Sequence, residues 1–139
     1  MTHPPDNKNI SASTEDYLEA IYLLSEEDPR VHSVAIARKL DVSRASVNKA
    51  VGLLRNSGLI VQEPYGTVSL TSKGLEQARQ ICQYHQVLLH FLQVVLNVTP
   101  AVAEQDACQI EHVISRETMQ KLIQYVRQKE PQKEPQKGS

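Results

Sequence analysis

The sequence predicts a mostly α-helical protein: an N-terminal winged helix-turn-helix with a small β-hairpin wing, followed by a C-terminal helical dimerisation domain. Three observations support this fold class. Apolar residues recur at helical spacing in six segments. Two short strand-like runs flank a Pro-Tyr-Gly turn at 64–66. Basic residues gather in the segment before that turn. We place the winged domain at residues 12–72 and the helical domain at 73–129, with disordered tails at 1–11 and 130–139.

Each expected element follows from a local pattern. Helices are expected over residues 14–26, 33–40, 44–57, 72–96, 100–113 and 115–129, and strands over 59–63 and 67–70. Side-chain oxygens that can cap a first helical turn are offered by Ser33, Ser43, Thr71 and Ser115. Gly58 marks the end of the third helix, because glycine readily adopts the left-handed conformation found there.

Composition and charge exclude several classes of protein. Of 139 residues, 40% are hydrophobic and 22% are charged, which is ordinary globular usage and argues against a disordered chain. The formal net charge of −1 excludes a globally basic nucleic-acid coat protein. Only 4% of residues are aromatic and none is Trp, so a stacking platform for single-stranded nucleic acid is disfavoured.

The chain carries no pattern expected of a secreted or membrane protein. The first ten residues are polar and contain no apolar signal-peptide core. The longest apolar run, 87–98, is interrupted by polar residues and is shorter than the roughly 20 residues needed to cross a bilayer. Two cysteines are too few for a disulfide scaffold. We therefore expect a cytoplasmic protein with no membrane partner.

The segment before the wing has the features of a reader of double-stranded DNA. Between residues 30 and 58 there are six basic residues and one acidic residue, a local net charge of +5 on a chain whose total is −1. The helix at 44–57 presents a polar N-terminal face, as a recognition helix does. The predicted DNA-binding residues are Arg38, Ser43, Arg44, Ser46, Asn48, Lys49 and Tyr65. The alternative is a plain packing unit with solvated basic side chains.

Three groups of residues have the spacing of metal ligands. Asp16 and Glu19 share a face of the first helix, being three residues apart. Cys108, Glu111 and His112 stand at positions i, i+3 and i+4 of a later helix, and His85 lies within the long helix. A thiolate, an imidazole and a carboxylate together favour Mn²⁺, Fe²⁺, Zn²⁺ or Co²⁺ over Ca²⁺ or Mg²⁺.

Each of these residues taken alone has a structural explanation. Asp16 could serve only the helix N-terminus, and Glu19 could be a solvated surface acid. Lone cysteines and histidines such as Cys108 and His85 are more often core residues. Cys82, one turn before His85, could be a further ligand, but core filling is the favoured assignment. The 108–112 triplet is harder to explain structurally, because it places two ionisable groups beside a thiol on one face.

With these residues in view, the chain resembles the diphtheria-toxin-repressor family of metal-dependent regulators, and most of all its short manganese-transport-regulator branch. The resemblance covers about residues 13–127. Three segments carry it: STEDYLEAIY at 13–22, LTSKG at 70–74 and CQIEHVIS at 108–115. The last, in the form C-x-x-E-H-x-x-S, is the most specific.

The resemblance implies a winged helix that binds a palindromic operator, C-terminal helices that form a homodimer, and Mn²⁺ or Fe²⁺ as co-repressor. By position it implies six ligands: Asp16, Glu19, His85, Cys108, Glu111 and His112. The manganese branch has glutamate where this chain has Cys108, and the iron branch has cysteine there. The iron branch also has glutamate where this chain has Leu89. The chain is too short for the SH3-like third domain of iron-type members.

We therefore predict a metal-dependent DNA-binding transcriptional regulator, a repressor that controls metal homeostasis genes. Mn²⁺ or Fe²⁺ is the expected co-repressor, and Cys108 leaves Zn²⁺ or Co²⁺ open. Apolar residues at 87–96 independently predict a homodimer. The alternative function is a winged-helix regulator that responds to an organic ligand, with the Cys/Glu/His cluster only structural. An enzyme is not expected, because no H-E-x-x-H, G-x-S-x-G or phosphate-loop motif is present.

Overall fold

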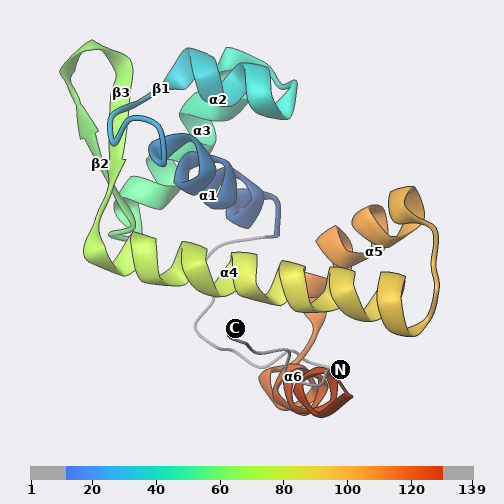
Figure 1. The fold of residues 1–139 in the computed structure, drawn as a ribbon. Helices are drawn as coiled ribbons and strands as arrows, with labels where there is room; N and C mark the ends of the chain where they lie inside the picture. The colour runs from blue at the N-terminus through green and yellow to red at the C-terminus, as the bar shows by residue number, and fades with distance from the viewer. Residues whose placement is uncertain (1–11, 130–139) are drawn as a thin grey trace, which may run out of the picture. The chain divides into compact units, whose positions relative to one another are not determined.

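The structure is a computed structural model that describes residues 12–129 (Figure 1). The tails predicted at 1–11 and 130–139 lie outside the described residues. In chain order the elements are α1 (Ala12–Ser25), β1 (Val31–His32), α2 (Ser33–Leu40), α3 (Arg44–Asn56), β2 (Ile60–Glu63), the 3₁₀ turn η1 (Pro64–Gly66), β3 (Thr67–Leu70), α4 (Ser72–His90), the π-helical turn η2 (Phe91–Val95), α5 (Pro100–Val113) and α6 (Arg116–Lys129). The prediction of a mostly α-helical chain with a small β-sheet is confirmed.

Contacts divide the described residues into two compact units, and the division falls between Cys82 and Gln83 in the sequence. The first unit holds α1 to β3 and the first part of α4, and the second holds the rest of α4 with η2, α5 and α6. The long helix α4 thus contributes residues to both units. The domain boundaries predicted at 12–72 and 73–129 stay a prediction.

The first unit is a winged helix-turn-helix. Strands β2 and β3 form the predicted antiparallel hairpin, with Ile60 opposite Leu70 and Glu63 opposite Thr67. A third strand, β1, pairs with the other edge of β3, so that the order is β1-β3-β2. Two residues are too few to produce a recognisable strand pattern, so β1 was not predicted.

Helices and wing share one apolar core. Each of the helices α1, α2 and α3 contributes at least one side chain with no exposed surface, namely Leu18, Ile36 and Leu54. Strand β3 adds Val68, which is 1% exposed. Burying one such aliphatic side chain contributes about 1.5–3 kcal/mol to folding. This core therefore fixes α3 against the wing and the other helices of the unit.

Helix α3 begins with the capping hydrogen bond expected from the sequence, whereas α2 does not. The Ser43 side chain accepts a hydrogen bond from the Ser46 amide at 3.0 Å, so Ser43 caps α3 as predicted. The prediction that Ser33 caps α2 is wrong, because that helix already includes Ser33 and its N-cap is His32. His32 pairs with Thr67 in the sheet, so the chain enters α2 directly from a strand without a side-chain cap.

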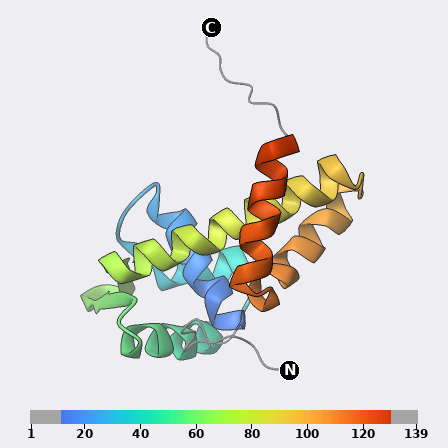
Figure 2. The ribbon, with the colours of Figure 1, turned by 90° about the horizontal axis from the view of Figure 1, so that it is seen from below.

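The second unit is a helical assembly around Leu88, Ala107, Met119 and Ile123. Figure 2 shows α5 returning beside the end of α4, with α6 against them. The helix predicted over 72–96 is α-helical as far as His90 and then widens into the π-helical turn η2. Asn97, with φ of 61°, ends it in the left-handed conformation. Within residues 12–129, no helix has the length and apolarity that a membrane span needs.

Candidate metal centre and DNA-binding surface

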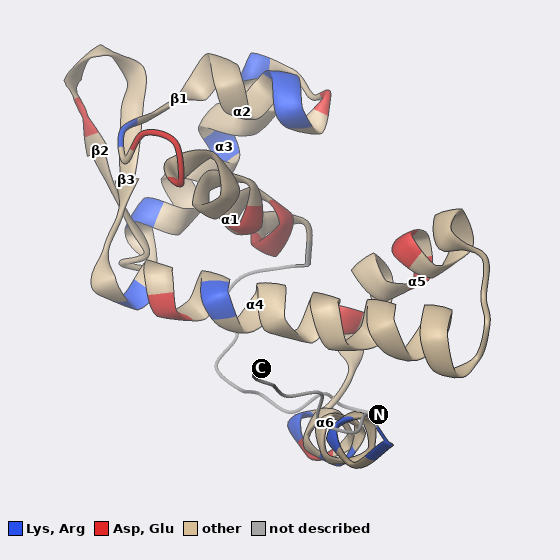
Figure 3. Ribbon diagram, viewed as in Figure 1, with Lys and Arg blue, Asp and Glu red and all other residues tan. Residues whose placement is uncertain are grey.

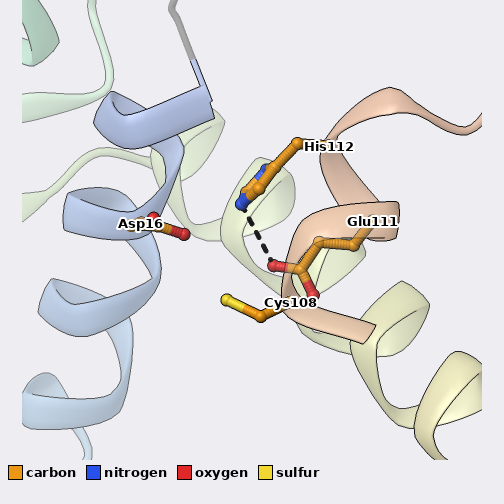
Figure 4. A group of neighbouring side chains, drawn as sticks. All are labelled: Asp16, Cys108, Glu111 and His112. Atoms are coloured by element: carbon orange, nitrogen blue, oxygen red, sulfur yellow. Dashed lines mark ion pairs between the residues drawn. The ribbon is translucent and has the colours of Figure 1, made fainter. Parts of the chain in front are cut away.

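Helix α5 presents three potential metal ligands from one face. Pro100 occupies its first turn, where the missing amide proton costs nothing, and the helix continues to Val113. The i, i+3, i+4 spacing then brings Cys108, Glu111 and His112 together, as Figure 4 shows. One ligand atom from each of these residues lies within 4.8 Å of the others. The grouping predicted from their spacing therefore exists in the folded helix.

The Glu111 carboxylate is the centre of this group. Its side chain is only 1% exposed, and Oε1 lies 2.7 Å from Nδ1 of His85 on α4. Its second oxygen, Oε2, lies 3.4 Å from Nε2 of His112, without hydrogen-bond geometry. Oε2 is the one buried side-chain oxygen or nitrogen in residues 12–129 that has no hydrogen-bond partner. A buried carboxylate oxygen without a partner is costly, and such a group calls for an explanation such as a bound cation.

His85 contacts a second carboxylate that the sequence did not single out. Its Nε2 lies 3.0 Å from Oε2 of Glu104, whose side chain is 60% exposed. Glu104 stands four residues before Cys108 on α5, one turn away. An exposed acid in a helix carries no sequence signal, and only the packing of α5 on α4 reveals its pairing with His85.

The two carboxylates predicted on α1 belong to the first unit. Asp16 and Glu19 are three residues apart and both are half-buried. The thiol of Cys82, on the part of α4 in the same unit, donates a weak hydrogen bond to Oε2 of Glu19 at 3.7 Å. Cys82 was assigned to core filling, and this contact with a predicted ligand was missed.

The donor set fits a transition-metal ion. Within the second unit, a thiol, a carboxylate and two imidazoles are available from Cys108, Glu111, His112 and His85. Oxygen and imidazole donors suit Mn²⁺ and Fe²⁺, whereas a thiolate favours Zn²⁺ and iron. The Glu111 oxygen that lacks a hydrogen-bond partner supplies the structural observation that a cation would explain. The assignment of all six residues as ligands remains a prediction.

Helix α3, the predicted recognition helix, presents an exposed polar face. All seven predicted DNA-binding residues are exposed: Arg38, Ser43, Arg44, Ser46, Asn48, Lys49 and Tyr65. Figure 3 shows the basic residues of α2 and α3 in blue. Asp41 adopts a left-handed conformation, with φ of 57°, in the tight turn between these two helices. The structure leaves these side chains available to a partner, and their role in DNA binding stays a prediction.

The tip of the wing projects one aromatic side chain into solvent. Tyr65 is 95% exposed, and its φ of 68° lies in the left-handed region that non-glycine residues rarely adopt. Gly66, with φ of 76°, follows it. Residues held in such conformations cost about 1–3 kcal/mol and gather at functional sites. The exposed ring and the strained backbone together are consistent with the predicted role of Tyr65, which stays a prediction.

Comparison with known proteins agrees with this arrangement. The domain described as "Iron dependent repressor, N-terminal DNA binding domain" matches residues 9–68. The domain described as "Iron dependent repressor, metal binding and dimerisation domain" matches residues 71–139. The chain belongs to the diphtheria-toxin-repressor family of metal-dependent transcriptional regulators. Its place in the manganese-regulator branch of this family is also confirmed.

Three transcriptional regulators have sequences similar to that of this chain. The transcriptional regulator MntR of Escherichia coli O157:H7 is 37% identical over 105 residues, which cover 76% of this chain and 67% of that protein. The HTH-type transcriptional regulator MntR of Shouchella clausii is 34% identical over 119 residues, 84% of this chain and 82% of that one. An uncharacterised HTH-type regulator of Methanocaldococcus jannaschii is 34% identical over 114 residues, 81% of this chain and 91% of that one.

A solved structure of the manganese regulator SloR has the same fold as this member of the family. Its TM-score is 0.74 at 31% identity, and the match covers 82% of this chain. The match covers 53% of SloR, so the chain spans about half the length of that regulator.

Proposed function

We propose that this chain is a metal-activated transcriptional repressor that binds a palindromic operator as a homodimer and controls metal homeostasis genes. Mn²⁺ or Fe²⁺ is its co-repressor. The observation that carries this proposal is the buried Glu111 carboxylate, which has an imidazole on each side and one oxygen without a hydrogen-bond partner among the described residues. In a chain with an exposed recognition helix, such a group is best explained as a metal site that regulates DNA binding.

We assign six residues to the metal. Asp16 and Glu19 contribute carboxylates from α1, and His85 contributes an imidazole from α4. The remaining ligands are Cys108, Glu111 and His112 of α5. A bound divalent cation would supply the positive charge that offsets several carboxylates and would link α1 to α4 and α5. The donor chemistry and the family resemblance support this assignment.

The charges of this chain's own side chains explain how a bound metal ion would affect DNA binding. Without a cation, Asp16, Glu19 and Glu111 carry like charges, which oppose bringing α1 and α5 together. With their charge offset, these residues can hold the DNA-binding unit in one arrangement. A fixed arrangement of two recognition helices in a dimer matches half-sites one helical turn of DNA apart, or a multiple of one turn.

The homodimer has a surface available to it in the second unit. Val94, Leu96 and Val113 are among the large apolar side chains that this unit leaves exposed. Exposed large apolar side chains such as these are available for burial in a protein interface. The dimerisation domain matched at residues 71–139 covers all three.

The other functions considered for this sequence receive less support. The related proteins named above are transcriptional regulators, which supports a non-enzymatic role. Nothing in these comparisons supports the alternative of an organic effector. A transcriptional regulator acts on chromosomal DNA, so we assign the protein to the cytoplasm.

A DNA-binding titration tests this function directly. Fragments upstream of the protein's own gene and of neighbouring genes are titrated in EDTA, Mn²⁺, anaerobic Fe²⁺ and Zn²⁺. We expect high-affinity binding only with a metal ion, and the order of the metals reports the preference of the site. Equal affinity in EDTA and in every metal would overturn the proposal and would direct attention to an organic effector.

A further inference from the structure

The end of the recognition helix is tied to the beginning of α4 by hydrogen bonds. We call this contact the α3–α4 joint; its residues are Ser57, Gly58, Leu59, Thr71, Lys73 and Gly74. The Thr71 hydroxyl donates to the Gly58 carbonyl at 2.8 Å, and the Thr71 amide donates to the Leu59 carbonyl at 3.0 Å. The Lys73 ammonium donates to the Ser57 carbonyl at 3.2 Å. Three successive carbonyls after α3 are therefore bound by Thr71, which directly precedes α4, and by Lys73 in the first turn of α4.

Gly74 allows the two backbones to approach closely. A Cβ atom built on Gly74 would lie 2.0 Å from the Leu59 carbonyl oxygen, a separation that real Cβ atoms do not reach. The Gly74 amide also donates to the Thr71 hydroxyl at 3.0 Å, which caps α4. The need for glycine here is steric, since any side chain would push α4 away from Leu59.

The α3 side of the joint is equally constrained. The Leu59 amide donates to the Leu54 carbonyl, and the Ser57 amide donates to the Leu53 carbonyl, both at 3.0 Å. Leu59 itself is 1% exposed and belongs to the core. The short segment that ends α3 therefore has its amides bound by α3 and its carbonyls bound by α4. A displacement of either helix would therefore also displace this segment and the other helix.

Helix α4 connects this joint to the candidate metal centre through its own backbone. It is a single α-helix from Ser72 to His90 and contains His85, a predicted metal ligand. At 1.5 Å per residue, its 19 residues span about 28 Å. Along the way Ala78 and Ile81 are buried in the core of the first unit. A displacement of His85 can therefore be transmitted along α4 to the joint, and from the joint to the end of α3.

We propose that the α3–α4 joint transmits the metal response from α4 to the recognition helix, with Gly74 as its positioning residue. This inference rests on the proposed function, because it names how that function is carried out. Effector couplings typically change affinity by about 5- to 150-fold. Loosening the joint should reduce this coupling and leave metal binding itself unchanged.

The test compares Gly74→Ala with Gly52→Ala. Both substitutions add one methyl group to a helical glycine, but a Cβ at Gly52 meets only the Arg55 side chain at 3.8 Å. Mn²⁺ affinity is measured without DNA, and affinity for a fragment upstream of the protein's own gene is measured in EDTA and in saturating Mn²⁺. The readout is the ratio of the two DNA affinities, with thermal melting as a check on folding.

We expect Gly74→Ala to reduce this ratio to less than about 5-fold, below the usual range of effector couplings, while Mn²⁺ affinity stays within about twofold of the unmodified protein. Gly52→Ala should keep the full ratio. If Gly74→Ala does not fold, Lys73→Ala replaces it, because the Lys73 side chain is exposed and its loss leaves the core intact. Lys73→Arg, which retains a donor for the Ser57 carbonyl, should restore the ratio.

The remaining outcomes separate this inference from the function on which it rests. If the unmodified protein gains affinity with Mn²⁺ and both joint variants keep the whole gain, the inference is wrong and the function stands. Equal losses in Gly74→Ala and Gly52→Ala would also overturn it, since the effect would not be specific to the joint. An unmodified protein without any Mn²⁺ response overturns the function and the inference together.

Discussion

Nδ1 of His85 lies 2.7 Å from Oε1 of Glu111, so a contact between two predicted metal ligands also joins α4 to α5. Nε2 of the same ring lies 3.0 Å from Oε2 of Glu104. Both ring nitrogens of His85 are thus engaged by carboxylates of α5. If His85 binds a metal, one of these contacts must be exchanged for it, and the ring is already held in place by the other.

The first prediction concerns the central carboxylate. Glu111→Gln keeps the size of the side chain and removes its charge. Mn²⁺ affinity should fall by more than about 100-fold, because substitution of residues that only hydrogen-bond to metal ligands already lowers metal affinity by about 10- to 100-fold. Metal titration by calorimetry measures this. Glu117→Gln on α6, an exposed acid in the same unit, is the control. Unchanged Mn²⁺ affinity in Glu111→Gln would remove Glu111 from the site.

Cys108 should determine which metal is preferred. Cys108→Ala removes a soft ligand, so Zn²⁺ affinity should fall at least about tenfold more than Mn²⁺ affinity, because thiolates bind Zn²⁺ better than Mn²⁺. Competition with a chromophoric chelator reports both constants. Cys82→Ala, which keeps Cys108, should leave the ratio of the two affinities nearly unchanged. Parallel losses for both metals in Cys108→Ala would show that the thiol does not discriminate between them.

Residues of the recognition helix should differ in how they affect DNA binding. Arg44→Ala should cost about 1–3 kcal/mol and relax the sequence preference, as expected when an arginine contacts a base edge. Lys49→Ala should weaken binding to all sequences and reduce the salt dependence by about one unit of slope, as expected for a phosphate contact. Affinities at several salt concentrations on a specific and a scrambled duplex distinguish the two effects. Lys121→Ala, exposed on α6, should change neither quantity.

The wing tip should show opposite effects on stability and on binding. Asparagine tolerates the left-handed conformation better than tyrosine, so Tyr65→Asn should leave the unfolding free energy unchanged or raise it by up to about 1 kcal/mol. The same change removes the exposed ring and should weaken DNA binding. Urea denaturation and DNA titration measure the two effects. A variant that is less stable and binds DNA normally would contradict the assignment of Tyr65 to the DNA interface.

Local patterns were sufficient to predict most of the fold. Ser43 caps α3 as predicted, because an N-cap depends only on residues within one turn. The hairpin around Pro64–Gly66 also follows from adjacent residues. Features that depend on distant partners were missed. Strand β1 exists because Val31 pairs with Val68, and the π-helical turn at Phe91–Val95 interrupts a run whose apolar spacing is helical throughout.

The candidate metal centre was predictable to the same extent. The triplet of Cys108, Glu111 and His112 lies within two helical turns, so its spacing alone indicated a shared face. Glu104 and Cys82 were not associated with the centre, because each contacts its partner, His85 or Glu19, across a helix packing that the sequence pattern does not specify. Gly74 belongs to the LTSKG segment that carries the family resemblance, but its steric role depends on the position of the Leu59 carbonyl, which the sequence does not give.

The shared helix α4 also sets a limit on how chains of this kind can change length. Gly74 and His85 are eleven positions apart, about three helical turns, so they face nearly the same direction. Deleting one residue between them would rotate His85 by about 100° about the helix axis relative to Gly74. Substitutions on the solvent side of α4 leave this phase intact, whereas an insertion or deletion of one residue destroys it. Variation in this part of the chain should therefore proceed by replacement of side chains and not by change of length.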